Sequence, residues 1–248
     1  MQTKQDVLQA CTVQGNIIKL PSVQLERKLY EDVAKSLQLI GGKWKGGKIS
    51  GFVFNEEPDE LLAQISNGQK RDLKKEFQFF ATPQPLAARL VQLANIEQYD
   101  LILEPSAGQG AIIKEIQKES KETVHYCELM PLNRTFLSKF NNVQYITDNF
   151  LKLAANKIVQ GMFHKIIANP PFANNQDIDH LKVMYNVCAI GGRIVSVMGK
   201  HWQYGSENKC KQFRQWLNEI DSEIIELEAG EFKESGTNIA TCILIINK

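Results

Sequence analysis

Seven short apolar runs, most of them separated by stretches with helical periodicity, dominate the chain beyond residue 100. Strands that alternate with helices pair into a mostly parallel sheet covered on both faces, so this pattern restricts the fold to the α/β class. The last two runs have no helix-length gap between them, which predicts a hairpin and one antiparallel strand. The predicted strands are Leu101–Leu103, Thr123–Cys127, Val143–Ile146, Lys165–Ala168, Arg193–Met198, Glu223–Leu227 and Ile239–Ile246.

The first part of the chain predicts a separate, small α+β module. A Pro-Ser pair at 21–22 opens a helix whose apolar side chains recur at helical spacing. A hairpin with a glycine turn is predicted over residues 43–54, and a second short helix begins at Pro58. We therefore expect two domains, residues 1–75 as a candidate substrate-recognition module and residues 76–248 as the main α/β domain.

Composition excludes several classes of protein. Apolar residues make up 43% and charged residues 23% of the chain, as in ordinary globular proteins. Lys and Arg exceed Asp and Glu by 29 − 28 = 1, so a surface for nucleic acid must be local. No apolar run reaches the ~18 residues of a membrane span, and the polar N-terminus lacks the apolar core of a signal peptide. We expect a cytoplasmic protein without membrane contact; the sequence predicts no oligomeric state.

The cysteines and histidines predict neither disulfides nor a metal site. The five cysteines are odd in number and include no C-x-x-C pair. The four histidines show no ligand spacing. We expect free, buried thiols in a reducing compartment.

A glycine-rich turn follows the first predicted strand of the α/β domain. The segment Glu104-Pro105-Ser106-Ala107-Gly108-Gln109-Gly110 leads from that strand into a helix. Gly108 and Gly110 let the backbone approach a ligand and expose amide groups at a helix N-terminus. A dinucleotide site would have a third glycine where Ile113 stands, and the acid Glu104 suits a cation or an amine better than a pyrophosphate. The alternative is an ordinary turn between a strand and a helix.

Two further acids end the next two predicted strands. Glu128 stands 20 residues after Gly108, where an acid accepts the hydroxyl groups of a ribose. Asp148 ends the third strand. Because the carboxyl ends of parallel strands meet at one edge, these acids are expected to line one ligand site. Unrelated loop carboxylates are the alternative.

Asn169-Pro170-Pro171-Phe172 follows the fourth predicted strand. The two prolines remove backbone donors and fix the chain, so that carbonyl groups face outward. The Asn169 side chain accepts a hydrogen bond from an amino group, and Phe172 offers an aromatic face. Together they predict a clamp for a planar group that bears an NH2; a rigid turn with a core phenylalanine is the alternative.

The chain contains the Glu104–Gly110 segment followed by Asn169-Pro170-Pro171-Phe172. With this pair of motifs it resembles the class I S-adenosylmethionine-dependent methyltransferases and, within them, the N6-adenine-specific DNA methyltransferases. Phe79-Phe80-Ala81-Thr82-Pro83 is similar to the segment that holds the methionine end of the cofactor in that family. The order of the motifs resembles the gamma arrangement. The resemblance covers residues 77–248 and implies a Rossmann-like, seven-stranded, mostly parallel sheet. Asn-Pro-Pro-Tyr/Phe also occurs in RNA N6-adenine enzymes and in glutamine-N5 enzymes that act on protein.

The resemblance implies S-adenosylmethionine as the cofactor. Glu104 would face its methionine amino group and Thr82 its carboxylate. Glu128 would accept its ribose hydroxyls, Leu129 or Met130 would pack on its adenine ring, and Asp148 would accept from its adenine amino group. The expected cofactor-binding residues are Thr82, Glu104, Pro105, Ala107, Gly108, Gly110, Glu128, Leu129, Asp148, Asn149, Phe150 and Asn169. The expected catalytic residues are Asn169, Pro170, Pro171 and Phe172.

The expected reaction is direct, in-line methyl transfer to an adenine flipped out of its stack. The Asn169 side-chain oxygen and the Pro170 carbonyl would each accept one N–H bond from the amino group. Phe172 would stack on the base, a contact worth about 1–3 kcal/mol. The reaction needs no cysteine nucleophile.

Further substrate contacts are expected outside these motifs. In the family an aromatic residue at Phe232 packs on the base, with a core position as the alternative. Trp202 could line the substrate path or serve ordinary packing. Lys43, Lys45 and Lys48 lie on one glycine turn without an acid, which predicts a phosphate-contacting hairpin; a solvated turn is the alternative.

DNA is the expected partner, and structured RNA is the first alternative. A protein glutamine side chain and a non-catalytic binding module that keeps the fold are further alternatives. Gamma-type DNA enzymes often carry a target-recognition domain after the catalytic one, whereas this sequence ends directly after the last predicted strand. Recognition is therefore expected from residues 1–75, from loops or from a partner.

Overall fold

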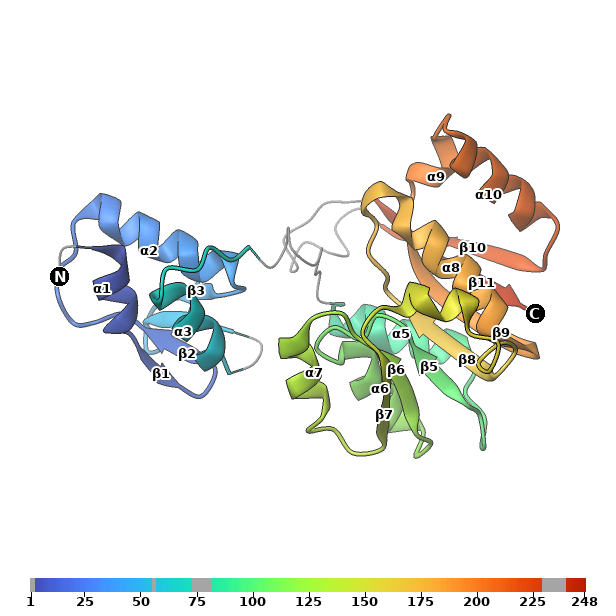
Figure 1. Cartoon of the computed structure of the whole chain (residues 1–248), viewed down its shortest axis with the longest axis horizontal. Coiled ribbons are helices and arrows are strands. Elements are labelled where there is room, and N and C mark those ends of the chain that lie inside the picture. Colours follow the sequence, from blue (N-terminus) through green and yellow to red (C-terminus); the bar gives the residue numbers. More distant parts are fainter. Residues whose placement is uncertain (1–2, 55–56, 73–81, 229–239) are drawn as a thin grey trace. The chain divides into compact units, whose positions relative to one another are not determined.

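The structure, a computed structural model, describes residues 3–54, 57–72, 82–228 and 240–248 (Figure 1). The chain divides into two compact units, residues 1–79 and 80–248, and each is described by itself. The predicted boundary between residues 75 and 76 falls in the segment 73–81, outside the described residues.

The N-terminal unit combines helices with a four-stranded antiparallel sheet in the order β1-β2-β4-β3. Ile18 and Phe52, paired across β2 and β4, are fully buried, as are Val33 and Leu37 of α2. One face of the sheet therefore packs in the core, and the residues that alternate with these face outward. The elements are α1 (Lys4–Gln9), β1 (Thr12–Gln14), β2 (Ile17–Lys19), α2 (Arg27–Leu39), β3 (Lys43–Lys45), β4 (Gly51–Val53) and α3 (Asp59–Ser66).

The predicted hairpin and second helix of this unit are confirmed as β3–β4 and α3. The predicted helix start at Pro21 is wrong. The amide of Val23 donates to the Pro21 carbonyl at 2.8 Å. This hydrogen bond spans two residues, whereas an α-helical bond spans four. Helix α2 begins only at Arg27. Helix α1 and the β1–β2 hairpin were not predicted, although Gly15-Asn16 is a typical two-residue hairpin turn.

The C-terminal unit contains a seven-stranded sheet in the order β10-β11-β9-β8-β5-β6-β7. β11 pairs antiparallel with both of its neighbours, whereas β7, β6, β5, β8 and β9 are mutually parallel. All seven predicted strands and the single antiparallel strand are confirmed. The strands are β5 (Ile102–Glu104), β6 (Val124–Cys127), β7 (Val143–Thr147), β8 (Phe163–Ala168), β9 (Cys188–Gly199), β10 (Ser222–Glu226) and β11 (Thr241–Asn247).

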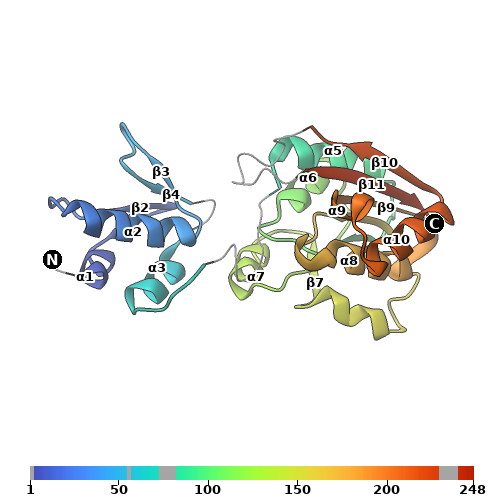
Figure 2. The same cartoon turned by 90° about the horizontal axis from the view of Figure 1, so that it is seen from above.

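Helices cover both faces of this sheet (Figure 2). One core joins the sheet to α5, α6 and α7, and the other joins it to η1, α8 and α10. Ile166 and Ile167 are both fully buried because each faces one of these cores. The helices are α5 (Gln84–Ala94), α6 (Ala111–Glu119), α7 (Pro131–Leu137), η1 (Phe150–Ala155), η2 (Ala173–Asn175), α8 (Gln176–Val187), α9 (His201–Tyr204) and α10 (Asn208–Asn218).

The topology identifies one edge of the sheet as the expected ligand position. The chain adds β6 and β7 on one side of β5, then adds β8 and β9 on the other. Ligands of α/β sheets bind at such a switch point, outside the carboxyl ends of the strands. The turn after β5 and the loop after β8 flank this position. Among the described residues, no helix combines the length and apolar character needed to cross a bilayer.

Candidate functional site

The turn after β5 is fastened to the end of β6. The Ala107 amide donates to the Cys127 carbonyl at 3.0 Å, and the Gly110 amide donates to the Ala107 carbonyl at 2.8 Å. Gly108 and Gly110 have left-handed φ angles of 54° and 77°. A Cβ added at Gly110 would lie 3.0 Å from a methyl carbon of Leu137. Glycine is therefore required at position 110 for both the backbone angle and the close approach of α7.

Glu128, the residue after β6, forms a hydrogen bond with the turn that follows β5. Its Oε2 accepts a hydrogen bond from the Gly108 amide at 2.6 Å, and its Oε1 accepts one from the Met130 amide at 2.7 Å. Burial raises the pKa of Glu128, and these hydrogen bonds act in the opposite direction. Each carboxylate oxygen can accept more than one bond, so Glu128 can hold the turn and still receive a ligand hydroxyl. Of the next two residues, Leu129 is 53% exposed and Met130 is buried, so Leu129 is the one free to pack on a ligand ring.

Glu104 is a buried carboxyl group with an unused oxygen. It is 2% exposed, and its Oε2 has no hydrogen-bond partner among the described residues. Burial, reinforced by the negative charge of Glu128, raises its pKa well above the usual value. A cationic ligand beside Glu104 and Glu128 would offset both the cost of burying the Glu104 charge and its repulsion from Glu128. This electrostatic demand matches the ammonium group expected from the sequence.

Asp148, at the end of β7, is an ionised acceptor. Its Oδ1 receives hydrogen bonds from Lys152 Nζ at 3.0 Å, the Asn149 amide at 2.7 Å and Thr147 Oγ1 at 3.2 Å. These bonds, the one from Lys152 first, hold the pKa of Asp148 below its usual value. Because all three converge on Oδ1, Oδ2 can accept from a ligand amino group.

The two residues after Asp148 support the site from within the protein. Asn149 caps η1, since its Oδ1 accepts from the Leu151 amide at 3.0 Å. Phe150 is 2% exposed, and its ring centroid lies 5.7 Å from that of His180. The Phe150 ring therefore lies in the core and offers no exposed face to a ligand.

Asn169, the first residue after β8, is oriented by Thr82. Its Nδ2 donates to Thr82 Oγ1 at 3.0 Å, whereas its Oδ1 is buried and has no partner among the described residues. A buried acceptor without a donor costs free energy, and an incoming N–H group would satisfy it. The resemblance implied that Thr82 lies at the methionine carboxylate; in the structure its hydroxyl group bonds Asn169.

Pro170, Pro171 and Phe172 continue from Asn169 at the same edge of the sheet. Pro170 is buried, and the next two residues are half-buried. Phe172 packs against the core that α5 and α6 form with the sheet. Phe172 as a whole is half-buried, so part of this residue is accessible at the edge of the sheet.

Two expected aromatic contacts have different outcomes. Trp202 is 3% exposed and meets Phe213 edge-on, with ring centroids 5.1 Å apart. Its ring serves the packing of α9 on α10 and offers no free face to a base, which corrects the substrate-path interpretation. Tyr204, two residues further on, is 82% exposed. Phe232 lies in segment 229–239, outside the described residues.

The three lysines of the predicted hairpin lie on the N-terminal unit. Lys43, Lys45 and Lys48 are all exposed. Trp44 pairs with the buried Phe52 across β3 and β4, with ring centroids 5.1 Å apart. Side chains alternate along a strand, so Lys43 and Lys45 stand on the outer face of the sheet.

A further lysine on this outer face was missed. Lys19 ends β2 and follows the buried Ile18, so its side chain also projects outward. It flanks Gly51, the residue that pairs with Lys45 on the next strand. The alternation around Ile18 was the available signal, and it was overlooked because β2 was not recognised. We use the name basic sheet face for Lys19, Lys43 and Lys45 together with Lys48, which lies in the turn between β3 and β4.

One group of metal-ligating side chains occurs in the part of the chain that the structure describes, although none was predicted. Atoms of His201, Glu207 and Cys210 lie within 4.8 Å of one another. His201 Nε2 is 2.9 Å from Glu207 Oε1, so a hydrogen bond explains their approach. Burial raises the pKa of Cys210, which disfavours the thiolate that binds metals. We assign no metal to this group.

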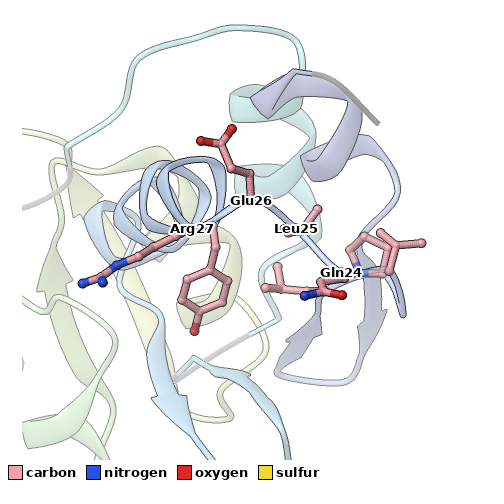
Figure 3. Close-up of a pocket in the computed structure, with 8 residues that line it drawn as sticks. Gln24, Leu25, Glu26 and Arg27 are labelled. Carbon is pink, nitrogen blue, oxygen red and sulfur yellow. The ribbon is translucent and has the colours of Figure 1, made fainter.

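A shallow cavity of about 590 Å³ lies at the start of α2 in the N-terminal unit (Figure 3). It is lined by Leu20, Pro21, residues 23–27 and Tyr30. Figure 3 shows the charged ends of Glu26 and Arg27 pointing in different directions, so they do not converge on one ligand position. No residue expected to bind cofactor or base lines this cavity.

Comparisons with known sequences find relatives among ribosomal RNA methyltransferases. The chain is 32% identical over 103 residues to a Methanococcus vannielii protein named "Probable ribosomal RNA small subunit methyltransferase A", covering 40% of this chain and 37% of that one. It is 28% identical over 106 residues to ribosomal RNA small subunit methyltransferase A of Caldanaerobacter subterraneus, covering 40% of each. The matches therefore span about two fifths of these relatives. No family model matches the sequence.

Comparisons with solved structures show a methyltransferase fold. The methyltransferase subunit of a type I restriction-modification system from Streptococcus thermophilus gives a TM-score of 0.57 at 20% identity, covering 68% of this chain and 44% of that one. The M protein of the type I restriction enzyme EcoKI gives 0.55 at 16% identity, covering 98% and 56%. The O-methyltransferase TomG from Streptomyces achromogenes, solved with S-adenosylmethionine, gives 0.54 at 12% identity, covering 71% and 86%. At these identities the likeness is one of fold.

Proposed function

We propose that this chain, which has the fold of the class I S-adenosylmethionine-dependent methyltransferases, methylates the N6 amino group of adenine in DNA. The observation that carries the proposal is the buried Oδ1 of Asn169, an acceptor without a donor among the described residues. It stands at the carboxyl end of β8, directly before two prolines and the half-buried Phe172. This combination fits a flat group that bears an NH2.

The cofactor would occupy the edge of the sheet between the turn after β5 and the ends of β6 and β7. Glu104 would bind its ammonium group, Glu128 its ribose hydroxyls and Asp148 its adenine amino group. Gly108 keeps the backbone close to the ligand, and Leu129 offers an exposed apolar side chain. The unused Oε2 of Glu104 is the feature that fits this ligand best. When bound, the cofactor supplies an electrophilic methyl group.

Asn169 and Pro170 would prepare the target amino group for attack. Asn169 Oδ1 and the Pro170 carbonyl would each accept one N–H bond, which favours a pyramidal nitrogen with its lone pair free. In the transfer, the amino nitrogen would take up the methyl group from the sulfonium sulfur of the cofactor and would lose one N–H proton to solvent. Thr82 assists by holding Asn169 Nδ2, so that Oδ1 keeps its direction. The rate enhancement comes from positioning and electrostatics.

Phe172→Trp is expected to retain more transfer activity than Phe172→Leu. Stacking needs a flat aromatic face, and leucine supplies bulk without one. The measurement is the turnover number at saturating cofactor, together with the KM for DNA. Equal turnover in the two variants would reduce Phe172 to a packing residue.

The basic sheet face would contact phosphate groups of the substrate. Replacement of Lys43, Lys45 and Lys48 by Ala is expected to lower the slope of log affinity against log salt by about 2–3, since each phosphate contact contributes about 0.9. Adding Lys19→Ala should lower it by about one more contact. Binding should weaken for all DNA sequences alike, because phosphate contacts position without specifying.

A matched triple variant controls for net charge in this test. Lys4, Lys28 and Lys35 lie on the helices α1 and α2 of the same unit. Their replacement by Ala removes the same charge and should leave most of the slope in place. Equal slopes in the two triple variants would remove the basic sheet face from the proposal.

RNA is the second candidate substrate, and a specific observation favours it. The matched relatives are named for ribosomal RNA. An adenine in RNA presents the same amino group, which the same clamp would hold. The choice between DNA and RNA depends on the surface that binds the nucleic acid, and phosphate contacts alone do not make that choice.

A transfer assay with a tritiated methyl group tests the proposed function. Duplex DNA, single-stranded DNA, structured RNA and cell protein are offered side by side to the full chain. We expect the highest incorporation into DNA. Label in RNA alone would support the second candidate, and label in protein alone would refute both.

A further inference from the structure

A buried carboxylate next to the clamp has no role in the reaction described above. Asp177 stands in the first turn of α8 and is 3% exposed. Charged side chains are rarely buried to this extent unless they are paired or hydrogen-bonded. Its surroundings therefore indicate what this carboxylate is for.

Asp177 joins the start of α8 to the end of β9. Its Oδ1 accepts from the amide of Ile178 at 3.0 Å, and its Oδ2 accepts from the amide of Gly199 at 3.0 Å. Gly199 is the last residue of β9, and the segment after it carries α9. One carboxylate thus connects the loops that follow two neighbouring parallel strands.

Phe172 lies at this connection. A Cβ added at Gly199 would stand 3.5 Å from Asp177 Oδ2 and 3.6 Å from Phe172 Cβ. Between Phe172 and Asp177 the chain turns back through Asn174 and Asn175, with left-handed φ angles of 57° and 55°. Left-handed residues in succession are uncommon outside glycine. The loop needs an anchor at its far end to keep this shape, and Asp177 supplies it.

The charges around Asp177 make the anchor sensitive to pH. Burial raises the pKa of Asp177 to about 6, whereas the Gly199 and Ile178 amides and Lys209 of α10 lower it. Cys210 of α10 and Cys242 of β11 also lie within reach of its charge. On its own helix, burial lowers the pKa of His180, so its imidazole stays neutral down to a lower pH than usual. Protonation places a hydrogen on one Asp177 oxygen, and that oxygen stops accepting from the backbone.

We propose that Asp177 is a positioning residue, which holds the Asn169–Phe172 loop against the end of β9 so that Phe172 can stack on the target base. The inference rests on the proposed function, because it assigns Asp177 a task in the same reaction. Asp177 does not touch the substrate or the cofactor. It acts through Gly199 and through the loop that carries Phe172.

Asp177→Asn tests this role with little change in shape. The amide offers one oxygen where the carboxylate offers two, so one of the two backbone bonds is lost. We expect turnover at saturating cofactor to fall about 10- to 100-fold, as small misplacements of catalytic groups do. Cofactor affinity and the melting temperature should stay close to those of the parent. A purely structural role would instead lower the melting temperature.

Asp179→Asn is the matched control. Asp179 lies in the same turn of α8, and its Oδ2 bonds Lys209 Nζ at 2.7 Å on the surface. This variant removes an ion pair without touching Gly199, so its turnover should match that of the parent. If Asp179→Asn and Asp177→Asn have equal effects on turnover, Asp177 is not a positioning residue.

The amide signal of Gly199 gives a readout that needs no activity. In nuclear magnetic resonance spectra of the full chain, this signal should titrate with an apparent pKa near 6 and lose that titration in Asp177→Asn. Turnover of the parent should fall as pH drops through the same range, and the variant should lack this decline. An absent Gly199 titration overturns the anchor. A titration without any transfer activity refutes the proposed function and the catalytic task, leaving the anchor as packing.

Discussion

Asn169→Ala is expected to lower turnover by about three orders of magnitude while leaving the cofactor dissociation constant within about twofold. Removal of one positioned transition-state partner costs about 10²–10³ in rate in other enzymes, and this variant also loses the group that fixes the direction of the target amino group. In the proposed reaction, Asn169 Oδ1 binds the amino group of the substrate and not the cofactor. Single-turnover transfer and calorimetry with the cofactor measure the two effects separately.

Thr82→Val sharpens this test. It keeps the shape of the side chain but removes the hydroxyl that receives Asn169 Nδ2 at 3.0 Å. Asn169 then keeps Oδ1 but loses the hydrogen bond that orients its side chain, so turnover should fall by less than in Asn169→Ala. Loss of cofactor binding in Asn169→Ala would show that the residue belongs to the cofactor site.

Glu104→Gln is expected to weaken cofactor binding and to stabilise the unliganded protein. A hydrogen bond between charged groups contributes about 1.5–3 kcal/mol, which corresponds to a 10- to 150-fold rise in the dissociation constant. The amide still fits the space but carries no charge to pair with an ammonium group. Calorimetry with S-adenosylmethionine measures this loss.

The stabilising effect of Glu104→Gln should grow with pH. The pKa of Glu104 is raised in the folded protein, so the unfolded chain ionises first. Stability therefore falls as pH rises from the usual glutamate pKa of about 4.3 through the raised folded value. A glutamine at 104 removes this loss. The gain in melting temperature should be small at pH 4.5 and larger at pH 8.

Glu115→Gln is the control for both effects. Glu115 is also buried, at 7% exposure, but it pairs with Lys118 on α6 at 2.7 Å. Its replacement should leave cofactor binding unchanged and should not stabilise the protein. A pH-independent loss of stability in Glu104→Gln would contradict the assigned electrostatic role.

The α/β sheet could be predicted mainly because its central strands, such as β5, β8 and β11, are buried on both faces. Such strands are short, nearly continuous apolar runs, which the sequence displays between polar stretches. The first and last residues of the strands were harder to predict. β9 begins at Cys188 and not at Arg193, because the strand continues through Gly191, whose φ is 78°, opposite an irregularity in β8. A Gly-Gly pair predicts a turn, and tertiary pairing overrides it here.

The positions of the acids and of the clamp could also be expected from the sequence. Ligands of such sheets bind outside the carboxyl ends of the strands, so a residue that directly follows a strand lies near this position. Individual contacts could not be expected. Thr82 and Asn169 are far apart in sequence, and only the fold brings them together. Trp202 carries no local sign of its packing on Phe213. Asp177 looks like an ordinary acid in the first turn of a helix, where a negative charge is favourable at the surface; its burial is a tertiary effect.

Nucleoside analysis of methylated DNA tests directly whether this chain methylates the N6 amino group of adenine. Duplex DNA is incubated with the full chain and S-adenosylmethionine carrying a deuterated methyl group. The DNA is then digested to nucleosides, which are separated by chromatography and identified by mass spectrometry. We expect labelled N6-methyladenine with the parent protein and about a thousandfold less with Asn169→Ala. Label on another base, or equal N6-methyladenine from the parent and Asn169→Ala, would contradict this expectation.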